Sequence, residues 1–128
     1  ITSIPGSSAY FKGAIISYDN AVKIEQLQVP AHIIESQGAV SEACVSTMAN
    51  NVRRLLKTDY AIATSGVAGP GGGTQEKPVG TVWIAVSSEK ETKATVFNFG
   101  DNRERTIQRT CIQGLDMLRK LLLKEAQS

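Results

Sequence analysis

Residues 61–86 read AIATSGVAGPGGGTQEKPVGTVWIAV, two apolar runs on either side of a long loop that is rich in glycine. The runs Ala61 to Thr64 and Val79 to Val86 predict two β-strands, the second of which contains Trp83. Residues 65–80 hold six of the eleven glycines. A loop of this kind, directly after the carboxyl end of a strand, lies where open α/β sheets bind their ligands.

The composition of this loop leaves two interpretations open. Glycine allows backbone N–H groups to come close to a ligand and to point together at an anion, so the loop is a candidate for ligand binding. The alternative is a long turn that only the chain path requires. No Gly-Lys-Ser or Gly-Lys-Thr follows the glycines and no helix is expected directly after them, so neither a P-loop nor a dinucleotide-binding fingerprint is present.

Upstream of the loop, short segments alternate between strand and helix patterns. Ala14 to Tyr18 is a β-type run, and Asn20 then predicts the N-cap of a helix that continues to about Gln28. Gly38 ends a second, short helix, and Ser41 can cap a third. The apolar positions of this third helix recur every three or four residues and predict its buried face: Val45, Met48, Val52 and Leu55.

Downstream of the loop, two further elements are expected. Ala94 to Phe99 is the predicted hairpin partner of the preceding strand, across the charged turn from Ser88 to Lys93. The last helix is expected from about Asn102 to Lys124. Its apolar stripe, which predicts its buried face, consists of Ile107, Cys111, Leu115, Leu118 and Leu122.

This order of strands and helices predicts an α/β fold, a layered α/β/α arrangement with a mixed sheet. A length of 128 residues and a hydrophobic content of 41% suit one domain over residues 1–128 with its own core. The number of strands is low for such a sheet, and a further N-terminal strand and helix would complete it. The opening residues Ile1 to Pro5 read like the tail of an earlier helix, so we expect that the first part of the domain is absent.

Composition and charge exclude several classes of function. The net charge of +2 and the scattered lysines and arginines provide no basic stripe for a nucleic acid. No apolar run approaches the roughly 18 residues that span a bilayer. Cys44 and Cys111 lack metal-type spacing and are expected to be buried free thiols in a reducing cytosol. The free thiols predict a cytoplasmic protein. His32 has no ligand partner nearby, so we expect no metal site.

A second group of residues, Tyr18-Asp19-Asn20-Ala21-Val22-Lys23, joins the end of the first strand to the helix after it. A lysine in the first turn of a helix faces the positive end of the helix dipole, which disfavours its charge. A lysine in its neutral form can act as a general base toward a serine hydroxyl, as in the Ser-Lys variants of the serine triad. The alternative is an ordinary solvated lysine.

Four stretches of the chain together resemble the CinA C-terminal domain, a family also known as the nicotinamide-nucleotide amidases. They occur in the family's order and at its spacing, and they cover nearly the whole chain. The glycine loop that runs into Glu-Lys-Pro-Val-Gly-Thr-Val-Trp is the most specific of them. The stretches are Pro5 to Phe11, Tyr18-x-Asn20-x-x-Lys23, Gly38 to Glu42, and Ser65 to Gly72 with Glu76 to Trp83, and Gly100-Asp101 with Arg103 also fits the family pattern.

The resemblance implies an amidase that hydrolyses the carboxamide of nicotinamide mononucleotide to nicotinic acid mononucleotide and ammonia, in pyridine nucleotide recycling. The family's mechanism is attributed to a serine nucleophile assisted by a lysine. That lysine maps onto Lys23, and the family's tyrosine maps onto Tyr18. No cofactor, metal, nucleic acid or membrane partner is implied, and a homo-oligomer is expected. The residues expected to bind the substrate are Asn20, Ser65, Gly66, Ala68, Gly69, Gly71, Gly72 and Thr74.

The sequence departs from the family pattern in one decisive place. The family's serine lies in a Glu-Ser-Cys-Thr-Gly-Gly segment upstream of the Pro-Gly-Ser-Ser turn, and the 128 residues do not include that segment. Asp19, Ser65 and Gln75 replace the more usual Ser, Thr and Pro, which are mild changes. The missing serine leaves a second interpretation open, in which this is a non-catalytic nucleotide-binding or regulatory domain of a competence- or damage-inducible protein.

Overall fold

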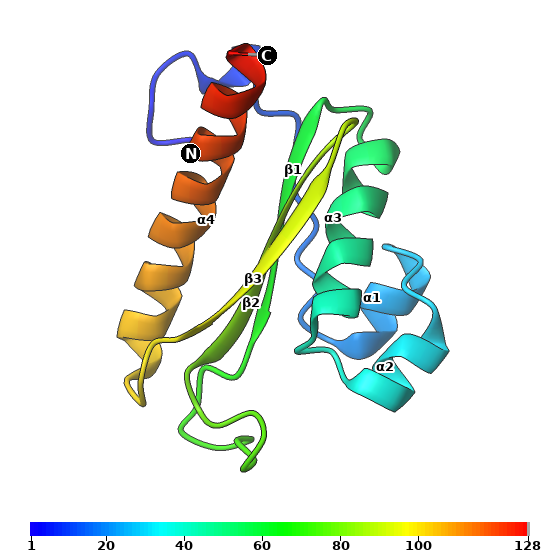
Figure 1. The fold of residues 1–128 in the computed structure, drawn as a ribbon, viewed down its shortest axis with the longest axis vertical. Helices are drawn as coiled ribbons and strands as arrows, with labels where there is room; N and C mark the ends of the chain where they lie inside the picture. The colour runs from blue at the N-terminus through cyan, green and yellow to red at the C-terminus, as the bar shows by residue number, and fades with distance from the viewer. Residues whose placement is uncertain (128) are drawn as a thin grey trace.

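The computed structural model describes residues 1–127, which fold into three layers (Figure 1). The middle layer is a three-stranded sheet. The long helix α4 (Arg103–Ala126) covers one face of the sheet, and α3 (Glu42–Leu55) packs on the other face, beside the short helices α1 (Asn20–Glu25) and α2 (Ala31–Gln37). A single 3-10 turn, η1 (Ser7–Ala9), precedes them. The expected layered α/β/α fold is confirmed.

The sheet is antiparallel in all of its pairings among residues 1–127. Strands β1 (Tyr60–Gly66), β2 (Thr81–Ser88) and β3 (Thr92–Asn98) lie in the order β1-β2-β3, and each neighbouring pair runs antiparallel. Strand β2 is the central strand and lies between the two helical layers, so nearly all of its residues are buried. The expected mixed sheet is therefore wrong for these residues, because the loop after β1 returns the chain directly beside β1 without a helical crossover.

The segment from Ala14 to Tyr18 is predicted as a strand, but it pairs with no strand in residues 1–127. Its side chains still alternate as in an extended chain, with Ile15 and Ser17 half-buried and their neighbours exposed. Residues of this segment and the Ile62–Thr64 part of β1 both line a cavity of about 360 Å³. The alternating pattern thus describes extended backbone outside the sheet.

Local side-chain caps set the helix boundaries. The carboxylate of Asp19 caps α1 by accepting a hydrogen bond from the Ala21 N–H at 2.7 Å, and Asn20, the expected cap, is the first helical residue. Aspartate and asparagine cap helices equally well, so the pattern alone can place this boundary one residue late. The hydroxyl of Ser41 accepts a hydrogen bond from the Cys44 N–H at 3.2 Å, which confirms the expected cap of α3.

The core lies between α3 and the sheet. Val45 and Met48 of the expected α3 face are buried, but Leu55 at the end of the helix is 55% exposed. The thiol of Cys44 is buried in this core as expected, whereas Cys111 on α4 is exposed, which corrects that expectation. The buried members of the core are Leu27, Val29, Cys44, Val45, Met48, Ala49, Ala63 and Ala85.

The buried face of α4 differs from the predicted stripe. The helix instead buries Thr106, Gly114 and Leu121. A Cβ added at Gly114 would lie 3.3 Å from the side chain of Ile62, so the helix packs closely on the sheet at a residue without a side chain. Neither α4 nor another helix in residues 1–127 combines the length and the apolar character of a membrane span. The exposed members of the predicted stripe are Ile107, Cys111, Leu115 and Leu122.

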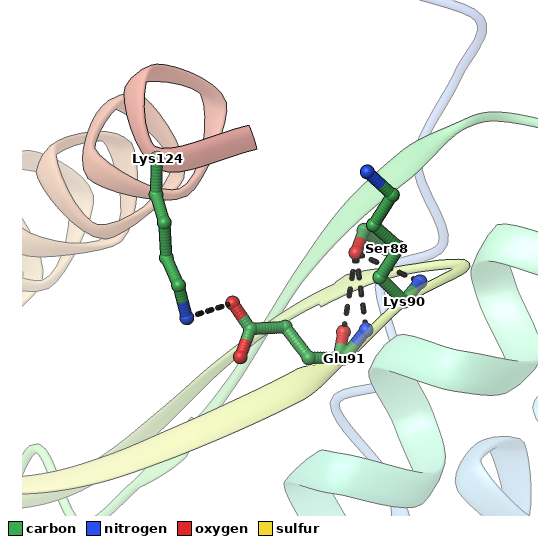
Figure 2. A network of polar contacts seen from close by, with 4 residues as sticks. All are labelled: Ser88, Lys90, Glu91 and Lys124. Atoms are coloured by element: carbon green, nitrogen blue, oxygen red, sulfur yellow. Dashed lines mark hydrogen bonds and ion pairs between the residues drawn. The ribbon is translucent and has the colours of Figure 1, made fainter. Parts of the chain in front are cut away.

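Polar contacts hold the β2–β3 turn (Figure 2). The hydroxyl of Ser88 accepts hydrogen bonds from the backbone N–H groups of Lys90 and Glu91, both at 3.2 Å. The carboxylate of Glu91 forms an ion pair with Lys124 at 2.8 Å. This pair ties the last turn of α4 to the hairpin, at the end of the sheet away from the glycine loop.

A close backbone contact joins the glycine loop to the segment that leads into α4. The N–H of Gly80 donates to the carbonyl of Val67 at 2.7 Å, and the carbonyl of Gly80 accepts from the N–H of Phe99 at 2.9 Å. Gly80 has a φ of +94°, and a Cβ at this position would overlap the carbonyl oxygen of Gly100. Only glycine meets both conditions.

We expect Gly80→Ala to lower the free energy of unfolding by about 3 kcal/mol or more, because the strained backbone alone costs about 1–3 kcal/mol and the overlap adds to it. Gly71→Ala is the matched control, since a Cβ there meets nothing within 4 Å. It should stay within about 0.5 kcal/mol of the wild type. Urea unfolding followed by circular dichroism measures both variants. Equal unfolding midpoints would show that the contact between Gly80 and Gly100 does not constrain the fold.

Candidate functional site

Lys23 of α1 is only 6% exposed, and its ammonium donates a hydrogen bond to the backbone carbonyl of Ser17 at 2.6 Å. The ion pairs of the described residues do not include it. The alternative of an ordinary solvated lysine is therefore wrong. Because α1 has only six residues, Lys23 belongs to its last turn as well, and the dipole argument made from the sequence no longer applies. Burial and the Ser17 contact define the surroundings of this ammonium.

A cavity of about 360 Å³ adjoins this lysine. Its volume lies in the range of small-molecule sites, and its wall is mostly apolar, with Ser17, Tyr18 and Thr64 as polar members. Ser17 both lines the cavity and accepts the hydrogen bond of Lys23, so the lysine contacts the cavity wall without being one of its lining residues. The lining residues are Ile15, Ile16, Ser17, Tyr18, Leu27, Met48, Val52, Ile62, Ala63 and Thr64.

Arg103, the first residue of α4, connects the tyrosine of the site to the glycine loop. Its guanidinium donates to the carbonyl of Gly69 at 2.8 Å and to the hydroxyl of Tyr18 at 3.4 Å. The Tyr18 side chain is otherwise exposed. Arg103 fits the family pattern, but its sequence position alone predicted no role for it. The signal that could have found it is a cation in the first turn of a helix, where the dipole disfavours positive charge.

The base of the glycine loop is packed into the fold. Ser65 and Gly66 are the last residues of β1, and a Cβ at Gly66 would lie 2.7 Å from the Val82 side chain. Gly69 is buried, has a φ of +82° and offers its carbonyl to Arg103, while Ala68 before it is half-buried. These expected substrate-binding residues therefore have clear structural contacts, and none of them lines the cavity.

The tip of the loop is open to solvent. Gly71, Gly72 and Thr74 are exposed, as is Asn20 at the start of α1. The N–H of Thr74 donates to the carbonyl of Lys77 at 2.9 Å, and the Thr74 hydroxyl accepts from the N–H of Lys77 at 3.0 Å. The tip is thus closed on itself, and the substrate-binding role expected for these residues remains a prediction.

Lys77 at the end of the tip reaches a distant part of the chain. Its ammonium donates to the carbonyl of Gln37, the last residue of α2 and 40 residues away in sequence. No local pattern could predict a contact over this separation. Burial raises the pKa of the Cys44 thiol, and the charges of Lys23 and Lys77 oppose that rise. Both lysines therefore lie close enough to Cys44 for their charges to act on it, and Cys44 is a core thiol with little thiolate character.

The comparison with protein families gives one match over nearly all of the chain, the CinA C-terminal domain, at residues 1–122. A CinA-like protein of Parasynechococcus marenigrum is 52% identical over 98% of this chain and 30% of its own length. A CinA-like protein of Thermosipho melanesiensis is 48% identical over 94% of this chain and 30% of its own length. The chain thus spans about 30% of the length of the curated relatives that it matches.

Solved structures agree with this assignment. The competence/damage inducible protein CihA from Agrobacterium tumefaciens superposes with a TM-score of 0.92 at 34% identity, over 94% of this chain and 74% of that chain. The competence damage-inducible protein A from Klebsiella pneumoniae superposes with a TM-score of 0.90 at 31% identity, over 95% of this chain and 76% of that chain. Together with the family match, these similarities show that the chain belongs to the CinA family and corresponds to its C-terminal domain.

Proposed function

We propose that this domain acts in a nicotinamide-nucleotide amidase, which hydrolyses the carboxamide of nicotinamide mononucleotide to the carboxylate and ammonia. The observation that carries the proposal is the buried Lys23, whose ammonium is held by the carbonyl of Ser17, a residue of the cavity wall. A lysine fixed beside a cavity of small-molecule size suits a general base. The names of the relatives do not state an activity, so the proposal rests on this geometry and on the family resemblance.

In the proposed reaction, a serine hydroxyl attacks the carboxamide carbon while Lys23 acts as the general base and accepts the hydroxyl proton. The new carbon–oxygen bond forms as the electron pair of the carbonyl moves onto its oxygen, which becomes an oxyanion. Lys23 then returns the proton to the amide nitrogen as the carbon–nitrogen bond breaks and ammonia leaves. Water hydrolyses the acyl-serine by the same route. In the family, this serine lies in a Glu-Ser-Cys-Thr-Gly-Gly segment, which the 128 residues do not include.

The other groups at the site suit binding rather than proton transfer. The exposed ring of Tyr18 offers a flat surface on which a nicotinamide ring can stack, and Arg103 holds its hydroxyl. Gly71 and Gly72 at the loop tip have no side chains to block the approach of a substrate. We assign their backbone N–H groups to the developing oxyanion, for which fixed N–H donors are well suited.

A second candidate is a nucleotide-binding or regulatory domain without turnover. The expected substrate-binding residues of the glycine loop do not line the cavity, which favours it. This alternative predicts that the full-length protein binds nicotinamide mononucleotide but releases no ammonia. The expected cytoplasmic location and homo-oligomeric assembly belong to both proposals.

A chain of residues 1–128, verified by intact mass, is expected to release no ammonia from nicotinamide mononucleotide, whereas the full-length protein is expected to release it. The reason is that no residue of the 128 matches the family's serine. Ammonia is measured with a coupled glutamate dehydrogenase assay, and binding is measured by calorimetry. Turnover by the 128-residue chain would mean that the nucleophile is within these residues, with Ser7, Ser8 and Ser65 as the candidates. Binding without turnover by the full-length protein would favour the regulatory domain.

Lys23→Met in the full-length protein is expected to lower kcat at least about a hundredfold, because methionine fills similar space but cannot accept a proton. Lys23→Arg should be as poor, even where it keeps the hydrogen bond to Ser17, since a guanidinium does not deprotonate in proteins. Lys90→Met, in the exposed β2–β3 turn, is the control and should keep the wild-type kcat. Thermal unfolding of each variant separates lost chemistry from lost folding. A folded Lys23 variant with nearly wild-type kcat would remove Lys23 from the mechanism.

Gly71→Ala tests the loop tip separately, because the added methyl group meets no protein atom within 4 Å. A tip that contacts the reacting group should lose kcat/KM about tenfold or more, with no change in stability. Steady-state kinetics and an unfolding curve on the same preparation measure both quantities. Wild-type values of kcat and KM in this variant would show that the loop tip is not part of the site.

A further inference from the structure

The family-like stretch Gly38 to Glu42 has no role in the proposed chemistry, but the structure gives it a contact. The ammonium of Lys77 donates to the carbonyl of Gln37, directly before this stretch. A Cβ at Gly38 would lie 2.8 Å from the Lys77 nitrogen, so a side chain at position 38 would displace the lysine. Gly38 also has a φ of +82°, which ends α2. The positive φ therefore favours glycine at this position, and the absence of a side chain also leaves room for the ammonium of Lys77.

The hydrogen bond between Lys77 and Gln37 is favourable for both the carbonyl and the ammonium. The last carbonyl groups of a helix have no partner within the helix, and a cation beside them meets the negative end of the helix dipole. Hydrogen bonds from a charged donor are stronger than neutral ones. Lys77 is half-buried, and the ion pairs of the described residues do not include it. The hydrogen bond to Gln37 is thus the interaction that holds its side chain.

The exposed turn of the glycine loop lies between two such cationic contacts. Residues 70–76 are all exposed, and the loop extends past the sheet at the end where α2 lies (Figure 1). On one side of the turn, Arg103 donates to the carbonyl of Gly69. On the other side, Lys77 donates to the carbonyl of Gln37. The internal bonds between Thr74 and Lys77 close the turn but do not attach it to the rest of the fold.

We propose that Lys77 is a positioning residue, which holds the exposed turn 70–76 in place for substrate binding by bonding the Gln37 carbonyl at the end of α2. Lys77 itself does not touch the substrate. The inference has a structural part, the anchoring of the turn, and a kinetic part, which rests on the proposed amidase function. The two parts are measured by different experiments.

The test compares Lys77→Met, Lys77→Arg and the control Lys90→Met in the full-length protein. Lys77→Met should make amide hydrogen exchange in residues 67–80 about tenfold faster, because it removes one charged hydrogen bond. The KM for nicotinamide mononucleotide should rise about tenfold while kcat changes less than about threefold. Lys77→Arg should restore both values, since a guanidinium can donate to the same carbonyl. Lys90→Met should leave both unchanged.

Each outcome decides one part of the proposal. Unchanged exchange in Lys77→Met would overturn the anchoring of the turn, whatever the kinetics. Faster exchange with unchanged KM would overturn the positioning role, and so would a loss of stability without a change in KM. Failure of the wild-type protein to release ammonia would end the amidase proposal, and the anchoring would then be judged by hydrogen exchange alone.

Discussion

The close approach of Gly80 to Gly100 is the constraint on which the arrangement of the site depends. The two glycines bring the end of the glycine loop against the segment between β3 and α4, where a side chain at position 80 would overlap the Gly100 backbone. Backbone hydrogen bonds from Gly80 to Val67 and from Phe99 to Gly80 hold this contact. Because Arg103 follows three residues after Gly100, its guanidinium can reach the Gly69 carbonyl. The packing of Gly80 against Gly100 thus brings the guanidinium of Arg103 to the glycine loop.

The cations around the candidate site share one kind of contact, with backbone carbonyls as their partners. They are Lys23 on Ser17, Arg103 on Gly69 and Lys77 on Gln37. Ion pairs instead gather on the C-terminal half of α4, where hydrogen bonds from Arg119 and Lys120 lower the pKa of Asp116. A carbonyl orients a cation without cancelling its charge. Arg103 and Lys77 therefore keep their positive charge beside the site, which suits the phosphate-bearing substrate of the proposed function.

The sequence predicted the order and type of most elements correctly, since these depend on patterns of a few residues. The cap at Ser41, the end of α2 at Gly38 and the β2–β3 hairpin are confirmed. The expected strand at Ala14 to Tyr18 shows the limit of such patterns. An alternating pattern predicts which side chains are buried, but it does not predict whether the backbone pairs with a neighbouring strand. The predicted stripe on α4 was wrong for a related reason: two of the residues that the helix buries, Thr106 and Gly114, are not large apolar residues, so an apolar pattern does not detect them.

The sequence by itself determined the local features of this protein, namely the caps, the turns with positive φ and the motifs that resemble the CinA family. Each of these depends on interactions within a few residues of the chain. Only the tertiary structure decided that Lys23 is buried, that Arg103 meets Tyr18, and that Lys77 reaches Gln37. These contacts join residues far apart in sequence or depend on how α1 packs against its surroundings. Their physical cause is the packing of helices on the sheet, which no short stretch of sequence contains.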